Sequence, residues 1–416
     1  MKISQLNKSF FLLAGYVMAS IGYVFSIKLA SLGVILLVAF WLLNFKKLTF
    51  SHILKPNVLH VLVIFFLLLI IASFYSEHLQ QAQKYIVRHL SFVLLPLVFL
   101  TIRPFNKKEY DTVIKVYIYA ITALFVICFF NAFYRQFIFT NEGGHFNWYF
   151  FYRYDFLEIF DQHPTYTSMY ALLALSFILN SGKSFFKRNW ICVLFILIQV
   201  ISIVLYGSRI AYIILFILFL AYAVKSLKNK SKKDIVKAGL FYLILLFGLI
   251  ITSWNIPIVK ERILFTLGYQ QDYKYNNQET IQNNTPEEQG RLLLWEDAVE
   301  LIKKKPLFGY GTGSNKIILQ EKYQEKGHIL FLNKKYNSHN TYLDLLLIGG
   351  IPLLFAYLVI LGAIVARGIK NKNFVLFSFF LIISITGLTE TIFRAQGIVF
   401  VAFFYCFLLS NNKHNE

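Results

Sequence analysis

Long apolar runs constrain this chain more than any other feature of its sequence. Most of its length consists of runs of about 17 to 25 mainly apolar residues, which is the length of an α-helix that crosses the hydrocarbon core of a bilayer. Hydrophobic residues make up 57% of the chain and the mean hydropathy is +0.58, too apolar for a soluble domain. Because lipid offers backbone groups no hydrogen-bond partners, such runs fold as helices. We therefore predict an all-α integral membrane protein.

The runs predict about 12 transmembrane helices that form a single polytopic membrane domain over residues 1–416. One long polar stretch, residues 255–337, interrupts them between the ninth and tenth helices, and it should itself contain helices. The expected spans are 10–27, 29–44, 57–75, 83–102, 112–135, 164–181, 189–206, 209–225, 235–253, 339–365, 374–389 and 392–411.

Basic residues predict the orientation of these spans. With the N-terminus inside, 22 Lys and Arg residues fall on the cytoplasmic side and 7 fall in the short outer segments. Positive charge favours the cytoplasmic side, and long loops are largely exempt from this rule. Both termini should therefore be cytoplasmic, and residues 255–337 should be extracytoplasmic. The net charge of +20 then reflects topology beside anionic membrane lipids, and we expect no nucleic-acid partner.

The polar stretch predicts a well-marked helix. Thr285 suits the N-cap, Pro286 the first position and Glu288 a capping box, and Pro306 stops the helix after about residue 304. Its apolar face should include Leu292, Trp295, Val299 and Ile302, and Arg291 lies in its second turn. The helix should present these side chains on the outer side.

Glycines at 309, 311 and 313 follow that helix. Because no strand precedes them, they do not predict a dinucleotide site but a tight turn whose backbone approaches another segment closely. Further on, Ser338 can cap the tenth span, which would place His339 on its first turn.

Two short outer segments carry basic residues, and each segment has a structural and a functional interpretation. Lys84 and Arg88 are four residues apart and share a helix face, either as a hydrated helix start or as a cationic wall. Arg209 follows Gly207 close to hydrocarbon, where it either extends to the membrane surface or binds an anion at the helix N-terminus.

Residues 136–163 are rich in aromatic side chains, which form either a belt at the membrane surface or a platform on which sugar rings stack. His163 ends this segment and precedes Pro164, a residue suited to the first turn of a helix.

One histidine and two arginines are expected on the same side of the membrane, and together they indicate a catalytic site. His339 can act as a general base near neutral pH, and Arg209 and Arg291 present planar groups that match phosphate oxygens. Together they predict a site that holds a diphosphate and deprotonates a hydroxyl.

Six segments of the chain form a recognisable set. They are residues 163–166 (HPTY), 208–209 (SR), 291–298 (RLLLWEDA), 306–313 (PLFGYGTG), 339–343 (HNTYL) with Gly350, and 390–397 (ETIFRAQG). These segments resemble the O-antigen ligase and polymerase superfamily of bacterial envelope glycosyltransferases. The resemblance spans roughly residues 160 to 400. The sequence departs from the family at Ile348 and Leu353, where the family often has an acid and a glycine.

The resemblance implies a GT-C-type membrane glycosyltransferase of the inner membrane that needs no metal or other cofactor and inverts the sugar. Its donor would be a glycan on undecaprenyl diphosphate, and its acceptor a sugar hydroxyl of lipid A-core. The O-antigen ligase is the expected member. His339 would be the base, and the diphosphate would contact Arg209 and Arg291. Assisting or supporting residues would be Lys84, Arg88, His163, Tyr166, Asn340, Tyr342 and Arg394.

Other functions stay open at this point. The same groups would serve an O-antigen polymerase or a protein O-oligosaccharyltransferase, because only the acceptor differs. A transporter is a remote alternative, since its polar groups would gather near the bilayer midplane on related halves, and here they gather at the outer rim.

Overall fold

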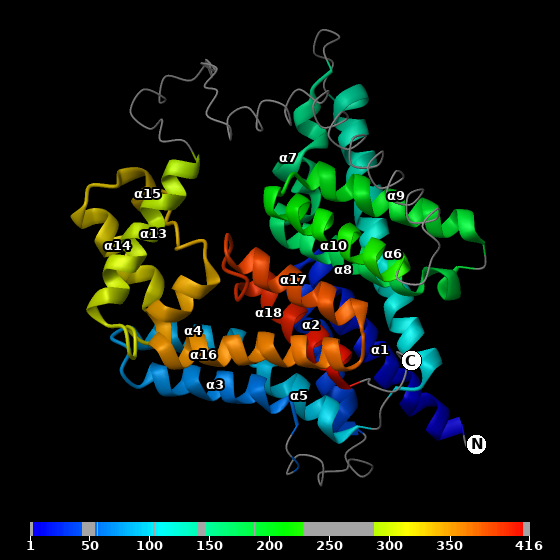
Figure 1. The fold of residues 1–416 in the computed structure, drawn as a ribbon, viewed down its shortest axis with the longest axis horizontal. Helices are drawn as coiled ribbons and strands as arrows, with labels where there is room; N and C mark the ends of the chain where they lie inside the picture. The colour runs from blue at the N-terminus through cyan, green and yellow to red at the C-terminus, as the bar shows by residue number, and fades with distance from the viewer. Residues whose placement is uncertain are drawn as a thin grey trace. The chain divides into compact units, whose positions relative to one another are not determined.

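The computed structural model describes residues 3–43, 55, 57–102, 105–139, 146–186, 188–227 and 287–410. All regular elements in these ranges are helical, as Figure 1 shows. The predicted span at residues 235–253, the first part of the polar stretch and the Thr285 cap lie outside the described residues. The chain divides into two units. The first comprises Met1–Tyr23, Ile27–Val113 and Asn277–Glu416, and the second Val24–Ser26 and Ile114–Asn276.

Within the described ranges, five helical stretches are long and apolar enough to cross a membrane: Leu79–Thr101, Lys107–Ile138, Asn189–Tyr206, Arg209–Leu227 and Thr341–Lys370. Shorter apolar helices accompany them, at Phe10–Phe25, Ile27–Leu43, His60–Ser73, Phe374–Gly387 and Gly397–Ser410. This composition agrees with a membrane protein built from helices. The count of 12 spans and the single polytopic domain stay predictions.

The first unit contains most of the helices. In it, α16 packs against α3 and α17, and α18 packs against α5. Its elements are α1 (Ile3–Phe25), α2 (Ile27–Leu43), α3 (His60–Ser73), α4 (Leu79–Arg88), α5 (Ser91–Thr101), the start of α6 (Lys107–Tyr134), α13 (Glu287–Lys304), α14 (Asn315–Glu325), α15 (Ile329–Asn333), α16 (Thr341–Lys370), α17 (Phe374–Gly387) and α18 (Ala395–Ser410).

The predicted helix 83–102 is two helices, α4 and α5, that meet at His89 and Leu90. His89 is 1% exposed, and its ring stacks on Tyr85 with centroids 4.3 Å apart. Its Nδ1 also contacts the carbonyl oxygen of Tyr85 at 2.8 Å. A buried polar ring with its own backbone partner thus occupies the junction, and Arg88 ends α4 beside it.

The second unit holds the remaining described elements. Its helices are joined by buried polar contacts, because Tyr117 Oη donates to the carbonyl oxygen of Tyr170 at 2.9 Å and Gln199 Nε2 donates to Thr122 Oγ1 at 3.0 Å. The elements are the rest of α6, η3 (Arg135–Phe139), η4 (Trp148–Phe151), α7 (Arg153–Leu157), η5 (Glu158–Phe160), α8 (Pro164–Phe185), α9 (Asn189–Tyr206) and α10 (Arg209–Leu227).

Helix α16 is broken at Gly350, whose φ of 61° and ψ of −152° are not helical. Pro352 follows two residues later and has no N–H to donate. The break therefore leaves carbonyl groups of the preceding turn without their usual partners. In a buried apolar setting such groups need other donors.

The predicted glycine turn supplies those donors. The backbone N–H groups of Tyr310 and Gly311 donate to the carbonyl oxygens of Leu347 and Ile348, at 2.8 Å and 2.9 Å. A Cβ at Gly350 would lie 2.2 Å from the carbonyl oxygen of Leu307, so only glycine fits this contact. The expectation that the glycine segment approaches another backbone closely is confirmed.

The same turn also reaches α3 and α4. Gly313 has a φ of 82°, and a Cβ there would lie 2.5 Å from the backbone nitrogen of Ala82 in α4. Thr312 Oγ1 donates to the carbonyl oxygen of Leu69 at 2.6 Å, and Ser76 Oγ donates to that of Thr312 at 2.9 Å. One segment therefore fastens α16 to α3 and α4.

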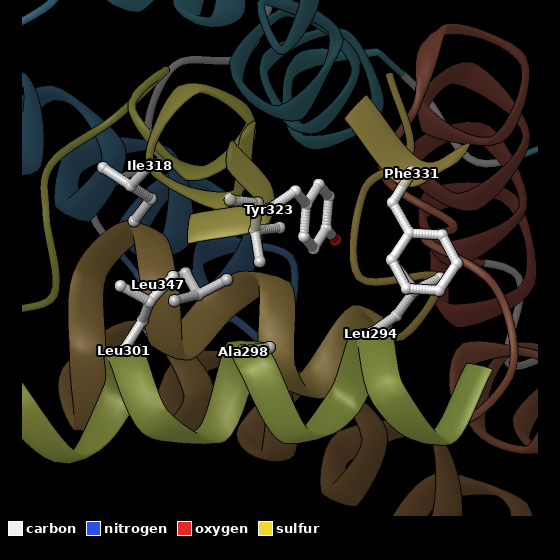
Figure 2. Close-up of a cluster of buried hydrophobic side chains, with 8 residues drawn as sticks. Leu294, Ala298, Leu301, Ile318, Tyr323, Phe331 and Leu347 are labelled. Carbon is white, nitrogen blue, oxygen red and sulfur yellow. The ribbon is translucent and has the colours of Figure 1, made fainter. Parts of the chain in front are cut away.

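Helices α13, α14 and α15 share a small apolar core with Leu343 and Leu347 of α16. Figure 2 shows Leu294 and Ala298 of α13 facing Tyr323 of α14, with Leu347 of α16 beside them. The expected end of α13 before Pro306 is confirmed, because α13 ends at Lys304. Its buried face centres on Leu294 and Ala298, with Trp295 and Ile302 packed at the edge. Leu292 and Val299 are exposed, so their predicted place on the buried face is wrong.

Candidate active site

His339 pairs with Glu390, a residue that the sequence did not single out. Its Nδ1 lies 3.3 Å from Oε1 and 3.4 Å from Oε2 of Glu390, whose residue exposure is 3%. The backbone N–H of Thr391 also donates to Oε1 at 3.1 Å. An ionised carboxylate only accepts, so we assign the proton to Nδ1. Nε2 then carries a lone pair and can take a proton.

The backbone at His339 differs from the expectation. Asn340, not Ser338, caps α16, because its Oδ1 accepts from the N–H groups of Tyr342 and Leu343 at 2.9 Å and 3.1 Å. His339 therefore precedes the helix, with a φ of 44° in the left-handed region. The predicted Ser338 cap and first-turn position of His339 are wrong.

The segment around His339 is tied to the segment around Glu390. Asn337 Nδ2 donates to Thr391 Oγ1 at 2.8 Å, and Thr341 Oγ1 donates to the carbonyl oxygen of Glu390 at 2.7 Å. Asn340 Nδ2 donates to the carbonyl oxygen of Leu388 at 3.0 Å. Because Asn337, Thr341 and Glu390 are all buried, these contacts hold the imidazole and the carboxylate in register.

Arg291 lies on α13 and is half-buried. Trp295, one turn later on the same helix face, donates from Nε1 to the carbonyl oxygen of Ser338 at 3.0 Å. The face of α13 that carries Arg291 therefore adjoins the segment that precedes His339. A direct role of Arg291 at the site stays a prediction.

Asp344 is a further buried acid near His339. It is 2% exposed and accepts a hydrogen bond from Asn315 Nδ2 at 2.6 Å. Arg394 and His339 both act on it electrostatically, which brings Arg394 to the same region. Asp344 lies in the first turn of α16, where a carboxylate also suits the helix dipole, and we predicted no role for it.

The two cations of α4 lie as expected. Lys84 and Arg88 both belong to α4, four residues apart, and both are exposed. Arg88 and Arg394 act together on Tyr85. The shared helix face is confirmed, and the contact of these residues with a diphosphate stays a prediction.

Asn340 and Tyr342 have structural contacts of their own. Besides its capping role, Asn340 binds the segment after α17. Tyr342 Oη donates to the carbonyl oxygen of Ser384 at 3.0 Å, and its ring centroid lies 5.5 Å from that of Tyr357. Their predicted support of the substrate stays a prediction.

His163 belongs to the second unit, where it caps α8 with its side chain. Its Nδ1 accepts from the N–H of Thr165 at 3.3 Å, and its Nε2 lies 2.9 Å from Tyr154 Oη. Tyr166 is 4% exposed, with its ring centroid 5.3 Å from that of His163. Pro164 is the first residue of α8, as predicted.

Arg209 is the first residue of α10, also in the second unit. It follows Gly207, whose φ of 66° ends α9, and a Cβ there would lie 2.5 Å from Cγ of Arg153. The start of a helix at Arg209 is confirmed. The meeting of Arg209 and His163 with His339 stays a prediction.

Over the ranges that the structure covers, no group of three or more His, Cys, Asp or Glu residues is arranged to hold a metal ion. Cys128, Cys192 and Cys406 all lie in helices, in α6, α9 and α18.

The segment from α9 to the middle of α16 is similar to a known family. Residues 192–358 match the family model for O-antigen ligase. This match agrees with the O-antigen ligase and polymerase superfamily that the motifs resemble, and it supports a glycosyltransferase-type enzyme of O-antigen or related glycan assembly. A search of curated proteins found no match.

The matched segment contains Arg209, Arg291 and His339. Glu390 and Arg394 lie beyond it in the chain, yet Glu390 is the hydrogen-bond partner of His339. The geometry around the histidine thus combines residues of the matched segment with residues outside it.

Proposed function

We propose that the protein is an O-antigen ligase, which moves a glycan from undecaprenyl diphosphate to a sugar hydroxyl of lipid A-core. The observation that carries this proposal is the pairing of His339, inside the matched segment, with the buried carboxylate of Glu390. An imidazole with an oriented Nδ1–H and an available Nε2 suits the removal of a proton from a hydroxyl.

In the proposed reaction, Nε2 of His339 takes the proton of the acceptor hydroxyl while the oxygen attacks the anomeric carbon of the donor sugar. A new glycosidic C–O bond forms, and the C–O bond to the diphosphate breaks with its electron pair on the leaving group. Attack from the opposite side inverts the anomeric carbon. Glu390 stabilises the imidazolium that forms, and Arg209 and Arg291 offset the charge of the departing undecaprenyl diphosphate.

The position of His339 supports a site at the membrane surface. The residue lies two positions before Thr341, the first residue of α16, which is a candidate membrane span. We propose that this end faces the periplasm and that both termini face the cytoplasm of a bacterial inner membrane. There the hydroxyl of a glycolipid and the diphosphate of a lipid carrier both reach the site from the outer leaflet.

Deletion of the gene tests the proposed acceptor. Long glycan chains should disappear from lipid A-core and accumulate on the carrier lipid, as seen on an envelope glycolipid gel. Single-repeat chains on lipid A-core would instead indicate a polymerase, and an unchanged gel would overturn the proposed function.

Treatment of the purified protein with EDTA tests the proposed chemistry. Because we assign proton removal to His339 and charge stabilisation to arginines, the rate of transfer should not change. Strong inhibition that added Mg²⁺ or Mn²⁺ reverses would contradict this assignment.

A further inference from the structure

Four cations gather on different elements of the first unit around the His339 region. We call them the cationic cluster: Arg88 at the end of α4, Lys316 in the first turn of α14, Lys335 after α15 and Arg394 before α18. All four side chains are exposed. Only two of them, Arg88 and Arg394, were candidates from the sequence.

One pair of the cluster is joined through aromatic packing. His89 follows Arg88 directly, and Phe393 precedes Arg394 directly. The ring centroids of His89 and Phe393 lie 6.4 Å apart, edge to face. The end of α4 therefore meets the segment before α18, and the backbones of Arg88 and Arg394 lie close together.

The other pair is joined through α14. Gln320 Nε2 donates to the carbonyl oxygen of Tyr336 at 2.9 Å, and Lys316 lies one turn before Gln320 on the same helix face. Lys335 precedes Tyr336, and its φ is 51°. The Tyr336 ring in turn contacts the ring of His339, with centroids 5.5 Å apart.

Each pair has one member near the same buried acid, Asp344. Asn315, which precedes Lys316, donates to Asp344, and Arg394 acts on Asp344 electrostatically. Burial together with the charges of Arg394, Lys335 and Arg88 lowers the pKa of Lys316. All four cations thus contribute to one local field.

That field has an excess of positive charge. The acids that face it are Asp344 and Glu390, both buried, and Glu390 is already paired with His339. No cation of the cluster forms an ion pair with an acidic residue among residues 3–43, 55, 57–102, 105–139, 146–186, 188–227 and 287–410. Mutually repelling cations that remain exposed lower their electrostatic free energy when an anion binds between them.

We propose that the cationic cluster is an anion subsite that binds a phosphate or carboxylate group of a substrate beside His339. The proposal rests on the proposed function and names a binding determinant for it. Arginine and lysine together suit such groups, because guanidinium forks bind two oxygens and ammonium groups add point charges. The anion can belong to the diphosphate of the donor or to a charged sugar of the acceptor.

A binding experiment separates the subsite from catalysis. The full chain with His339→Ala, in lipid nanodiscs, is titrated with radiolabelled inorganic pyrophosphate. Adding Lys316→Gln and Lys335→Gln should weaken binding by roughly tenfold to a hundredfold, the effect of losing two charge-assisted contacts. The control adds Lys303→Gln and Lys304→Gln, which remove the same charge from the end of α13 and should leave affinity unchanged.

The proposal is wrong if the variant with Lys316→Gln and Lys335→Gln and the control variant bind pyrophosphate with equal affinity. Because both cluster lysines are exposed, folding should be unaffected, which thermal unfolding checks. If the double variant unfolds, Lys335→Gln is compared with Lys334→Gln, its exposed neighbour, and equal affinity again overturns the subsite. Absence of glycan transfer by the unchanged protein would overturn only the proposed function, since the binding measurement does not need turnover.

Transfer kinetics then identify the source of the anion. A rise in KM for the donor alone in the cluster variant assigns the subsite to the diphosphate. A rise in KM for the acceptor that vanishes with a dephosphorylated acceptor assigns it to acceptor phosphate, and one that persists assigns it to acceptor carboxylate. If neither KM rises relative to the control variant, the subsite does not serve a substrate and the proposal is wrong.

Discussion

Two histidines in this protein lie within two residues of the start of a long helix, and their surroundings differ. At His163 both ring nitrogens are engaged, Nδ1 by the N–H of Thr165 and Nε2 by Tyr154 Oη. At His339 Nδ1 contacts Glu390, and no residue in the described ranges hydrogen-bonds Nε2. At His163 both ring nitrogens serve the local structure, whereas at His339 Nε2 is left available to a substrate.

The backbone explains this difference. His163 has an extended conformation with a φ of −82°, from which its own side chain caps α8. His339 has a φ of 44°, and the neighbouring Asn340 performs the capping of α16. Moving the cap by one residue frees the imidazole from the helix N-terminus. A shared position before a helix therefore does not imply a shared role.

The largest test of this comparison is His339→Ala. Loss of the proposed base should lower the rate of transfer roughly 10²–10⁴-fold while the amount of protein in the membrane stays the same. A reconstituted transfer assay with quantified protein measures this. Retained turnover would remove His339 from the proposed role and erase the contrast with His163.

A smaller effect should follow Glu390→Gln. An amide can turn its N–H₂ towards Nδ1 and thereby favour the wrong tautomer of His339, so kcat should fall by about tenfold to a hundredfold with little change in KM. The matched control is Glu321→Gln on the exposed face of α14, which should keep full activity. Equal activity of both variants would show that the carboxylate does not orient the imidazole.

Arg291→Lys sharpens the comparison on the side of His339. A lysine keeps the charge but not the planar fork, so turnover should fall by about tenfold if Arg291 holds phosphate oxygens. Arg367→Lys in the last turn of α16 is the control. Full turnover of the Arg291 variant would rule out a bidentate contact with the diphosphate.

His163→Ala should have the smallest effect on transfer. Removal of a side-chain cap should lower the free energy of unfolding by about 0.5–2 kcal/mol, because one N–H of the first turn of α8 loses its partner. Thermal unfolding measures the loss, and the transfer assay should show nearly unchanged turnover. A loss of turnover as large as that of His339→Ala would place His163 in the reaction.

Features that local rules govern were predictable from the sequence. Pro164 and Arg209 begin helices as expected, and α13 ends before Pro306. Each depends on a residue and its immediate neighbours, such as a proline that suits a first turn but cannot continue a helix. The close backbone approach of the glycine turn was also foreseen, although its target, the break at Gly350, was not.

Features that distant residues govern were not predictable. Ser338 and Asn340 can both cap a helix, and the contact of Asn340 with the carbonyl oxygen of Leu388, 48 residues away, accompanies the observed choice. His339 and Glu390 are 51 residues apart, a separation that no periodicity connects. Lys316 and Lys335 likewise converge with the other cations only after α14 and α15 have packed on α16.

The break in helix α16 does not make the helix flexible at that point. Peptide groups of residues 306–311 complete the hydrogen bonding that Gly350 and Pro352 interrupt. The turn of α16 around Gly350 and the glycine turn therefore form one hydrogen-bonded unit. In the sequence, His339 lies a few residues before this part of α16, and Lys316 lies a few residues after the glycine turn. The backbone beside the proposed site is therefore preassembled, and any adjustment to the size of a substrate has to come from elements outside this hydrogen-bonded unit.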